Sequence, residues 1–237
     1  MKLLALDTST EACSVAVFAD GVTFSEFELT PRAHTQLILP MVEMVLAAAG
    51  LRLQEVDAIA VGCGPGAFTG IRIGVGVAQG LAMAADKPVI PLSTLAALAQ
   101  QAYVQHGATQ VLVALDARMG EVYWGQYALQ DGLMQLQGEE HVCAPAAVPV
   151  PASDAWFAIG HGWAAYAEAL QTRFAGKLTG TDAESLPAAE FMLPLAVAEW
   201  QAGRVVAPEE AQPVYLRNKI ALTTQERLAG KPSLINQ

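Results

Sequence analysis

Three short apolar runs rich in β-branched residues open the chain, and a helix, a strand and a second helix are expected after them. The runs cover 3–7, 12–19 and 22–29. Asp20-Gly21, between the last two, is a strong signal for a two-residue hairpin. A shorter version of this order begins again with strands expected at 111–116 and 121–129. The repeated order predicts an α/β protein of two related lobes, 1–107 and 108–237, each built on a mixed sheet.

Helix signals separate the strands. Thr30-Pro31 can supply the N-cap and first position of a helix that stops at Gly50, and Pro40 predicts either a start near that residue or a kink. A strand at 58–64 leads through a glycine-rich loop into a helix at 69–85. The other expectations are a strand at 89–92, a helix from Ser93 to near Gly107, a connection at 144–155, a strand at 156–160, helices near 162–174 and 188–202, and a polar, frayed end from about 223.

Composition narrows the function classes. Of 237 residues 53% are hydrophobic and only 15% charged, which predicts either a large core or an apolar surface that another chain covers. A net charge of −10 argues against a chain that binds nucleic acid by itself. Three distant cysteines fit a reducing cytosol. Asp7 and Glu11 interrupt the first apolar run, so we expect a cytoplasmic protein with neither signal peptide nor membrane span.

The stretch VGCGPGAFTGIRIG at 61–74 brings the backbone close to a phosphate or to another part of a protein. Gly62-x-Gly64-x-x-Ala67 fits a relaxed dinucleotide fingerprint, but no acidic strand end follows about 20 residues later. A Walker loop needs Lys-Ser/Thr where this chain has Ile71-Arg72. Protein contact is therefore the better explanation of these glycines.

Small residues continue into the helix at 69–85 in two series spaced by four. The series are Gly70, Gly74, Ala78 and Gly76, Gly80, Ala84. A helical glycine costs about 1 kcal/mol relative to alanine, so close approach of another element is expected in return. One possibility is that the helix packs only against the chain's own sheet. The other is that one small-residue face packs against the sheet and the other face packs against a second helix. The helix at 33–49 is apolar nearly all round, which also predicts burial on two sides.

The inventory of catalytic side chains is short. The four histidines form no HxxxH or HExxH pattern. Asp7, followed by Thr8 and Ser9, and Asp116 end strands at corresponding places in the two lobes. Such a pair could hold Mg²⁺ in a cleft, or each aspartate could cap a turn.

Four motifs in this order resemble the TsaB (YeaZ) family of bacterial tRNA threonylcarbamoyladenosine biosynthesis proteins. They are LLALDTSTEACSVAV (3–17), GCGPGAFTGIRIGVGVAQGLA (62–82), LDARMGEVYWGQY (115–127) and PVYLR (213–217). The resemblance implies the duplicated actin-like (ASKHA) fold. It implies a partner of the catalytic subunit TsaD that, with the ATPase TsaE, supports threonylcarbamoyl transfer to the adenosine 3′ of the anticodon in ANN-decoding tRNAs. Contact with tRNA is expected only through the complex.

Departures from the catalytic relative TsaD shape the functional hypothesis. The stretch at 92–103 lacks the metal-binding histidines that TsaD carries there, and Asp116 is followed by Ala-Arg-Met rather than glycines. We therefore expect no metal, a vestigial nucleotide site and at most weak ATP or ADP binding at the partner junction. The vestigial site is assigned to Asp7, Thr8, Ser9, Asp116 and Gly160.

The leading hypothesis is a non-catalytic scaffold that pairs with TsaD, or with a second copy when alone, through the helices at 33–49 and 69–85. The C-terminal segment is expected to lie back on the first lobe. The interface is assigned to His34, Leu37, Ile38, Met41, Val45, Thr69, Arg72, Gly74, Val77 and Leu81. The alternative is an actin-like ATPase with Mg²⁺ at Asp7 and Asp116; a peptidase is disfavoured by the missing histidine ligands.

Overall fold

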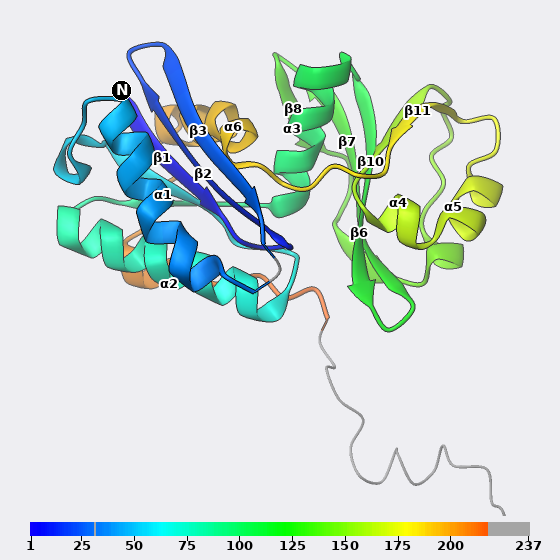
Figure 1. The fold of residues 1–237 in the computed structure, drawn as a ribbon. Coiled ribbons are helices and arrows are strands. Elements are labelled where there is room, and N and C mark those ends of the chain that lie inside the picture. The colour runs from blue at the N-terminus through cyan, green and yellow to red at the C-terminus, as the bar shows by residue number, and fades with distance from the viewer. Residues whose placement is uncertain (31, 218–237) are drawn as a thin grey trace, which may run out of the picture.

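Two β-sheets stand side by side in the computed structural model, which describes residues 1–30 and 32–217 (Figure 1). The first sheet has the order β3-β2-β1-β4-β5, with β1 at Lys2–Asp7, β2 at Ala12–Ala19, β3 at Val22–Leu29, β4 at Ala58–Gly62 and β5 at Val89–Leu92. The first three strands form an antiparallel meander, and β4 and β5 run parallel to β1. Asp20 and Gly21 both have positive φ, as a two-residue hairpin requires, so the predicted hairpin is confirmed.

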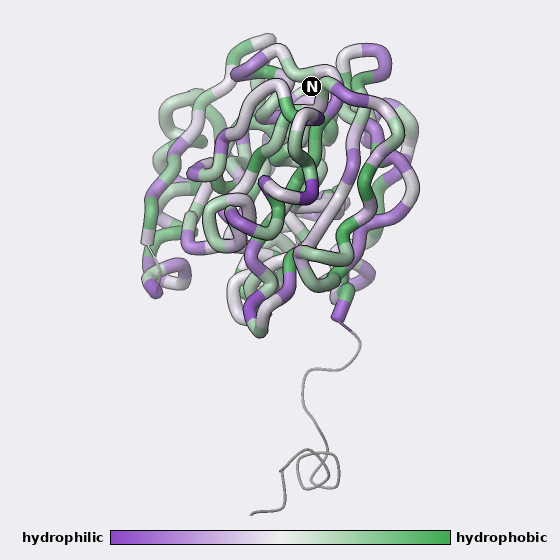
Figure 2. Tube along the Cα trace, turned by 90° about the vertical axis from the view of Figure 1, so that its right-hand side faces the viewer, coloured by the Kyte–Doolittle hydropathy of each residue, from purple (hydrophilic) through white to green (hydrophobic). Residues whose placement is uncertain are grey.

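Helices cover both faces of this sheet. Helices α1 (His34–Ala48) and α2 (Phe68–Ala85) lie on one face, and α6 (Ala189–Gln201) lies on the other. Side chains of β1 alternate between the two layers: Leu4 and Leu6 join the core under α1 and α2, while Leu3 and Ala5 join the core under α6. Figure 2 shows hydrophilic residues gathered in many of the peripheral turns.

Helix α1 begins before Pro40, not near it as one of the two predicted alternatives had it. It starts at His34, with Ala33 as its N-cap, and Pro40 lies within it on the exposed side. A start near Pro40 is therefore wrong. Thr30 lies outside the helix, and Pro31 is outside the described residues. Gly50 follows the helix with φ +66, the left-handed conformation expected of a stop signal.

The second sheet has the order β11-β10-β6-β7-β8, and β9 pairs with β7. Its strands are β6 (Gln110–Arg118), β7 (Glu121–Gln130), β8 (Leu133–Leu136), β9 (His141–Cys143), β10 (Trp156–Ile159) and β11 (Leu178–Asp182). Strands β8, β9 and β11 were not predicted. The helix expected at 162–174 is two short helices, α4 (Gly162–Ala165) and α5 (Ala167–Arg173), divided at Tyr166. Short 3₁₀ turns lie at Leu53–Glu55, Pro145–Ala147 and Pro208–Glu210.

Helix α3 (Thr94–His106) connects the lobes. Its predicted cap is confirmed, because the Ser93 hydroxyl accepts from the backbone N–H groups of Leu95 and Ala96 at 3.1 and 3.3 Å. Leu95 and Leu98 lie in the core of the second sheet, whereas α6, from the second half of the chain, lies on the first sheet. The first sheet ends with β5 at Leu92 and the second begins with β6 at Gln110, and one helix from each half of the chain packs on the other half's sheet.

Candidate functional site

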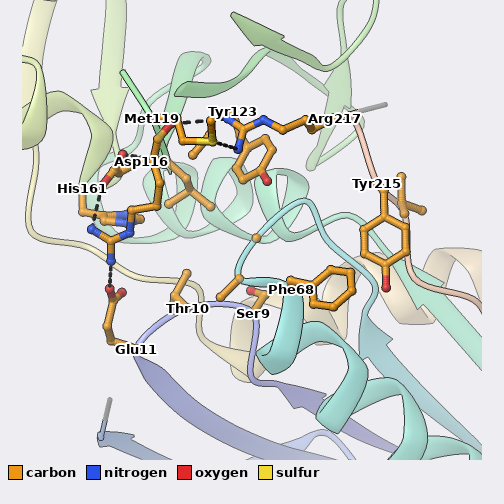
Figure 3. A pocket seen from close by; sticks show the side chains of 16 residues that line it. Ser9, Thr10, Glu11, Phe68, Asp116, Met119, Tyr123, His161, Tyr215 and Arg217 are labelled. Carbon is orange, nitrogen blue, oxygen red and sulfur yellow. Dashed lines mark hydrogen bonds and ion pairs between the residues drawn. The ribbon is translucent and has the colours of Figure 1, made fainter. Parts of the chain in front are cut away.

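The cleft between the lobes encloses a cavity of about 360 Å³ (Figure 3). The residues that follow β1 and the last residues of β6 line it. Its lining residues are Ser9, Thr10, Glu11, Gly66, Ala67, Phe68, Leu115, Asp116, Ala117, Arg118, Met119, Tyr123, His161, Val214, Tyr215 and Arg217. Of the residues assigned to a vestigial nucleotide site, Ser9 and Asp116 line the cavity, while Asp7, Thr8 and Gly160 do not.

Asp7 is enclosed beneath the cavity. Its Oδ1 accepts from the backbone N–H and the hydroxyl of Ser9 at 2.8 and 2.6 Å, and its buried Oδ2 has no partner among the described residues. Burial raises the pKa of Asp7 to about 6 despite these hydrogen bonds. A Cβ at Gly62 would lie 1.9 Å from Oδ2, so the β4 backbone closes that side. The Asp7 carboxyl is therefore sealed inside the lobe.

The glycine-rich loop and the start of α2 rest directly on the backbone that follows β1. A Cβ at Gly66 would lie 2.3 Å from the Ser9 carbonyl oxygen, and one at Gly70 would lie 2.0 Å from the Thr8 carbonyl oxygen. The Thr8 hydroxyl donates to the Gly70 carbonyl at 2.7 Å. The close approach that the sequence predicted is therefore to protein, within the same lobe.

Asp116 is held by its own neighbours. Its Oδ1 accepts from the Arg118 backbone N–H at 2.8 Å and from the Tyr166 hydroxyl at 2.9 Å. Its Oδ2 pairs with the Arg118 guanidinium at 2.9 Å, and the same guanidinium reaches Glu11 in the first lobe at 2.9 Å (Figure 3). A side-chain cation thus stands between the carboxylates of the two lobes.

Gly160 packs closely against β6 of the second sheet. Its φ is +103, and a Cβ there would lie 2.5 Å from the Ala114 carbonyl oxygen, so only glycine fits beside β6. The next residue, His161, lines the cavity, and its buried Nδ1 has no partner in the described part of the chain. Burial lowers the pKa of His161, which favours the neutral imidazole.

The segment at 211–217 crosses the mouth of the cavity from the first lobe to the second. Val214 N–H donates to the Cys63 carbonyl at 2.8 Å, and Arg217 pairs with Glu121. The ring of Tyr215 lies 5.5 Å from that of Phe68, centroid to centroid. Residues 211–217 therefore contact both lobes, and the rest of the predicted C-terminal segment lies outside the described residues.

Arg72 joins the same aromatic group. Its guanidinium carbon lies 3.8 Å above the centre of the Phe68 ring, and its Nε donates to the Tyr215 hydroxyl at 2.8 Å. All three side chains are exposed at the surface. The start of α2 therefore carries an arginine and two aromatic rings beside the cavity.

Half of the residues predicted for a partner interface lie in the core of the first lobe. His34, Ile38, Met41, Val45 and Gly74 are buried against the chain's own sheet, so their assignment to the surface is wrong. Leu37, Val77 and Leu81 are half-buried, and Thr69 and Arg72 are exposed. The residues that these helices turn outward include Leu39, Met44, Gly76, Gly80 and Met83. The sequence pattern found two apolar faces but did not say which one faces outward.

Several cavity residues were not predicted as a site. Arg118 and Glu11 are 107 residues apart, and Arg217 and Glu121 are 96 apart. No local pattern connects such pairs. Phe68, Met119 and Tyr215 stand in the motifs that carried the family resemblance, which was the available signal for them.

Within residues 1–30 and 32–217, no group of three or more His, Cys, Asp or Glu side chains is arranged to hold a metal ion. By length and composition alone, α2 is long and apolar enough to cross a membrane. Helices that pack in a protein core share this length and composition, and the inner face of α2 lies in the core of the first lobe.

Comparison with known proteins places the chain in a family. A family model described as tRNA N6-adenosine threonylcarbamoyltransferase, TsaD, matches residues 27–225. The tRNA threonylcarbamoyladenosine biosynthesis protein TsaB of Escherichia coli (strain K12) is 47% identical over 98% of this chain and 100% of its own. The chain belongs to the TsaB family. The TsaB protein of Haemophilus influenzae is 45% identical over 98% of both chains.

A solved structure agrees with this membership. YeaZ from Pseudomonas aeruginosa is 52% identical and superposes with a TM-score of 0.85, covering 91% of this chain and 99% of that one. The predicted family and its duplicated actin-like α/β fold are thereby confirmed for this TsaB-family chain.

Proposed function

We propose that this TsaB-family chain acts in tRNA threonylcarbamoyladenosine biosynthesis as a non-catalytic subunit that pairs with TsaD. The names of its relatives support the pathway. The outer face of α2 carries the proposal of pairing, because that face has the features of a helix contact and nothing in the described chain covers it.

Gly76 and Gly80 are the decisive residues. Both are exposed, and a Cβ at either would meet no heavy atom within 4 Å. Each costs the helix about 1 kcal/mol relative to alanine, and the fold of the described residues gains no close contact in return. Ala84 continues this small, exposed series. A helix of another chain can therefore approach the α2 backbone closely.

Exposed apolar side chains lie on the two helices α1 and α2. Leu39 and Met44 on α1 are 46% and 51% exposed, and Met83 on α2 is 58% exposed. Exposed apolar side chains on these helices can add apolar area to a contact with another chain. The same face serves either TsaD or, when TsaD is absent, a second copy in an isologous homodimer.

The state of the two aspartates supports a non-catalytic role. Asp7 is sealed inside the first lobe, and Arg118 already bridges Asp116 and Glu11. These side chains do not fit a Mg²⁺–nucleotide held by both aspartates. Weak ATP or ADP binding at the partner junction, recruitment of TsaE, contact with tRNA through the complex and a cytoplasmic location are parts of the proposal that follow from the family resemblance.

Substitution of Gly80 by leucine tests the pairing. We expect Gly80→Leu to fold as the parent chain does and to lose co-purification with TsaD and support of tRNA threonylcarbamoylation. Ala169→Leu, at an exposed position of α5, is the matched control and should behave as the parent. Normal complex formation and tRNA modification by Gly80→Leu would show that this face is not the interface.

Calorimetry with ATP and Mg²⁺ on the lone chain tests the non-catalytic role separately. We expect no tight binding and no turnover. Tight binding with turnover that disappears in Asp7→Ala would contradict the scaffold proposal and establish the ATPase alternative.

A further inference from the structure

We infer that the cavity between the lobes is an anchor site for an apolar side chain of the TsaD partner. This inference rests on the proposed function. It extends the contact from the outer face of α2 into the cleft that lies beside the start of that helix.

The walls of the cavity favour an apolar occupant. Eight of the lining residues offer mainly carbon surface: Ala67, Phe68, Leu115, Ala117, Met119, Tyr123, Val214 and Tyr215. A pocket of this size and lining suits an aliphatic or aromatic side chain, which gains free energy from the apolar area that it buries.

The charges around the cavity disfavour a phosphate. Arg118 is paired with Glu11 and Asp116, and Arg217 is paired with Glu121. Glu11 and Asp116 are themselves lining residues, so an anion would approach two carboxylates whose cation is shared. A nucleotide or an RNA backbone would have to break these pairs, whereas an uncharged side chain leaves them intact.

The cavity is continuous with the proposed interface. Tyr215 lines it and also lines a shallow pocket along α2 formed with Arg72, Val75, Gly76, Gln79, Gln212 and Pro213. A helix packed on Gly76 and Gly80 would therefore lie next to the cavity mouth. Aromatic and arginine side chains at a pocket rim are the usual composition of an interface hot spot.

Arg72 indicates a polar group beside the anchor. The Arg72 Nε donates to the Tyr215 hydroxyl, and Arg72 forms no ion pair among the described residues. Its guanidinium is exposed and lies flat on Phe68, so its remaining N–H groups can donate to a partner. We expect the TsaD segment to present an apolar side chain together with a carboxylate or backbone carbonyl.

Ala67→Trp tests the inference by filling the mouth of the cavity. Ala67 is exposed, precedes α2 and lines the cavity, and it lies outside the series at Gly76 and Gly80. Titration calorimetry of the full chain into TsaD should show a dissociation constant at least about tenfold weaker than the parent's, the loss typical of a blocked hot spot. Ala169→Trp, the matched control on α5, should bind as the parent does.

Met119→Ala removes a wall of the same cavity without adding bulk, and it provides the test if Ala67→Trp does not fold. We expect it to weaken TsaD binding several-fold with an unchanged melting temperature. TsaD affinity equal to the parent's in a folded Ala67→Trp, or in Met119→Ala, would overturn the inference. A change confined to tRNA binding, self-association or the stability of the lone chain would also overturn it, in favour of RNA, a second copy or an occupant within the chain.

Gly80→Leu separates this inference from the proposed function. If Gly80→Leu loses TsaD while Ala67→Trp keeps it, the helix contact stands and the anchor site is wrong. If Gly80→Leu keeps TsaD, the proposed pairing face itself is wrong.

Discussion

The glycines on the two faces of α2 differ in the contacts that surround them. On the inner face, a Cβ at Gly70 or Gly74 would lie 2.0 or 2.7 Å from an oxygen of Thr8. On the outer face, a Cβ at Gly76 or Gly80 would meet nothing within 4 Å. The fold of this chain therefore requires glycine at the two inner positions. No contact among the described residues requires glycine at the two outer positions. Glycines of one helix can therefore report on two different contacts.

Single alanine substitutions should change stability in opposite directions on the two faces, and this is the largest effect that we expect. Gly70→Ala forces a methyl group against the Thr8 carbonyl, which should lower the free energy of unfolding by about 3 kcal/mol. Gly76→Ala should raise it by about 1 kcal/mol. Urea denaturation of both variants measures the two changes in the free energy of unfolding. Changes of the same sign would contradict the difference between the two faces.

The pH dependence of stability tests whether the Asp7 carboxyl, beside the Thr8 backbone on which α2 packs, is sealed from solvent. Since the pKa of Asp7 is raised from 3.8 to about 6 in the folded chain, its contribution is greatest at low pH and is lost as the pH rises through 6. Between pH 4.5 and 8 this loss should be roughly 2 kcal/mol.

Asp7→Asn isolates this contribution. The variant keeps an oxygen for Ser9 and cannot ionise, so its stability relative to the parent should rise across that pH range. Denaturation at several pH values measures it. Parallel pH profiles for parent and Asp7→Asn would mean that the Asp7 carboxyl is solvated rather than sealed.

The bridge between the lobes should have the smallest effect on stability. Arg118 is 72% exposed, so solvent screens its pair with Glu11, and a double-mutant cycle with Arg118→Ala and Glu11→Gln should give a coupling of at most about 1 kcal/mol. The coupling should vanish in 1 M salt. A larger, salt-independent coupling would show that this pair, rather than apolar contact, holds the lobes together.

Local patterns predicted most of the elements, because their signals are contained in a few residues. The Asp20-Gly21 hairpin and the Ser93 cap of α3 are of this kind. Asp131-Gly132 carries the same hairpin signal before the unpredicted strand β8, with positive φ at both residues. The two aspartates do lie at or near strand ends, as the local pattern predicted, but only Asp116 lines the cavity, whereas Asp7 is buried beneath it.

The rest depends on contacts between distant residues. Helical spacing showed that α1 and α2 have two apolar faces, but only the position of the sheet decides that Met41 faces inward and Met44 outward. The crossing of α3 and α6 between the sheets, and the pairs that Arg118 and Arg217 form, have no local signature. For this reason half of the predicted interface residues belong to the core.

The affinity of TsaD for the double variant Gly76→Ala/Gly80→Ala tests the central claim most directly. Two methyl groups in open space should raise the free energy of unfolding of the lone chain by about 2 kcal/mol, while they hold a partner helix away from the α2 backbone. We predict a more stable chain whose dissociation constant for TsaD is at least about tenfold weaker. A more stable chain that binds TsaD as tightly as the parent would contradict the account.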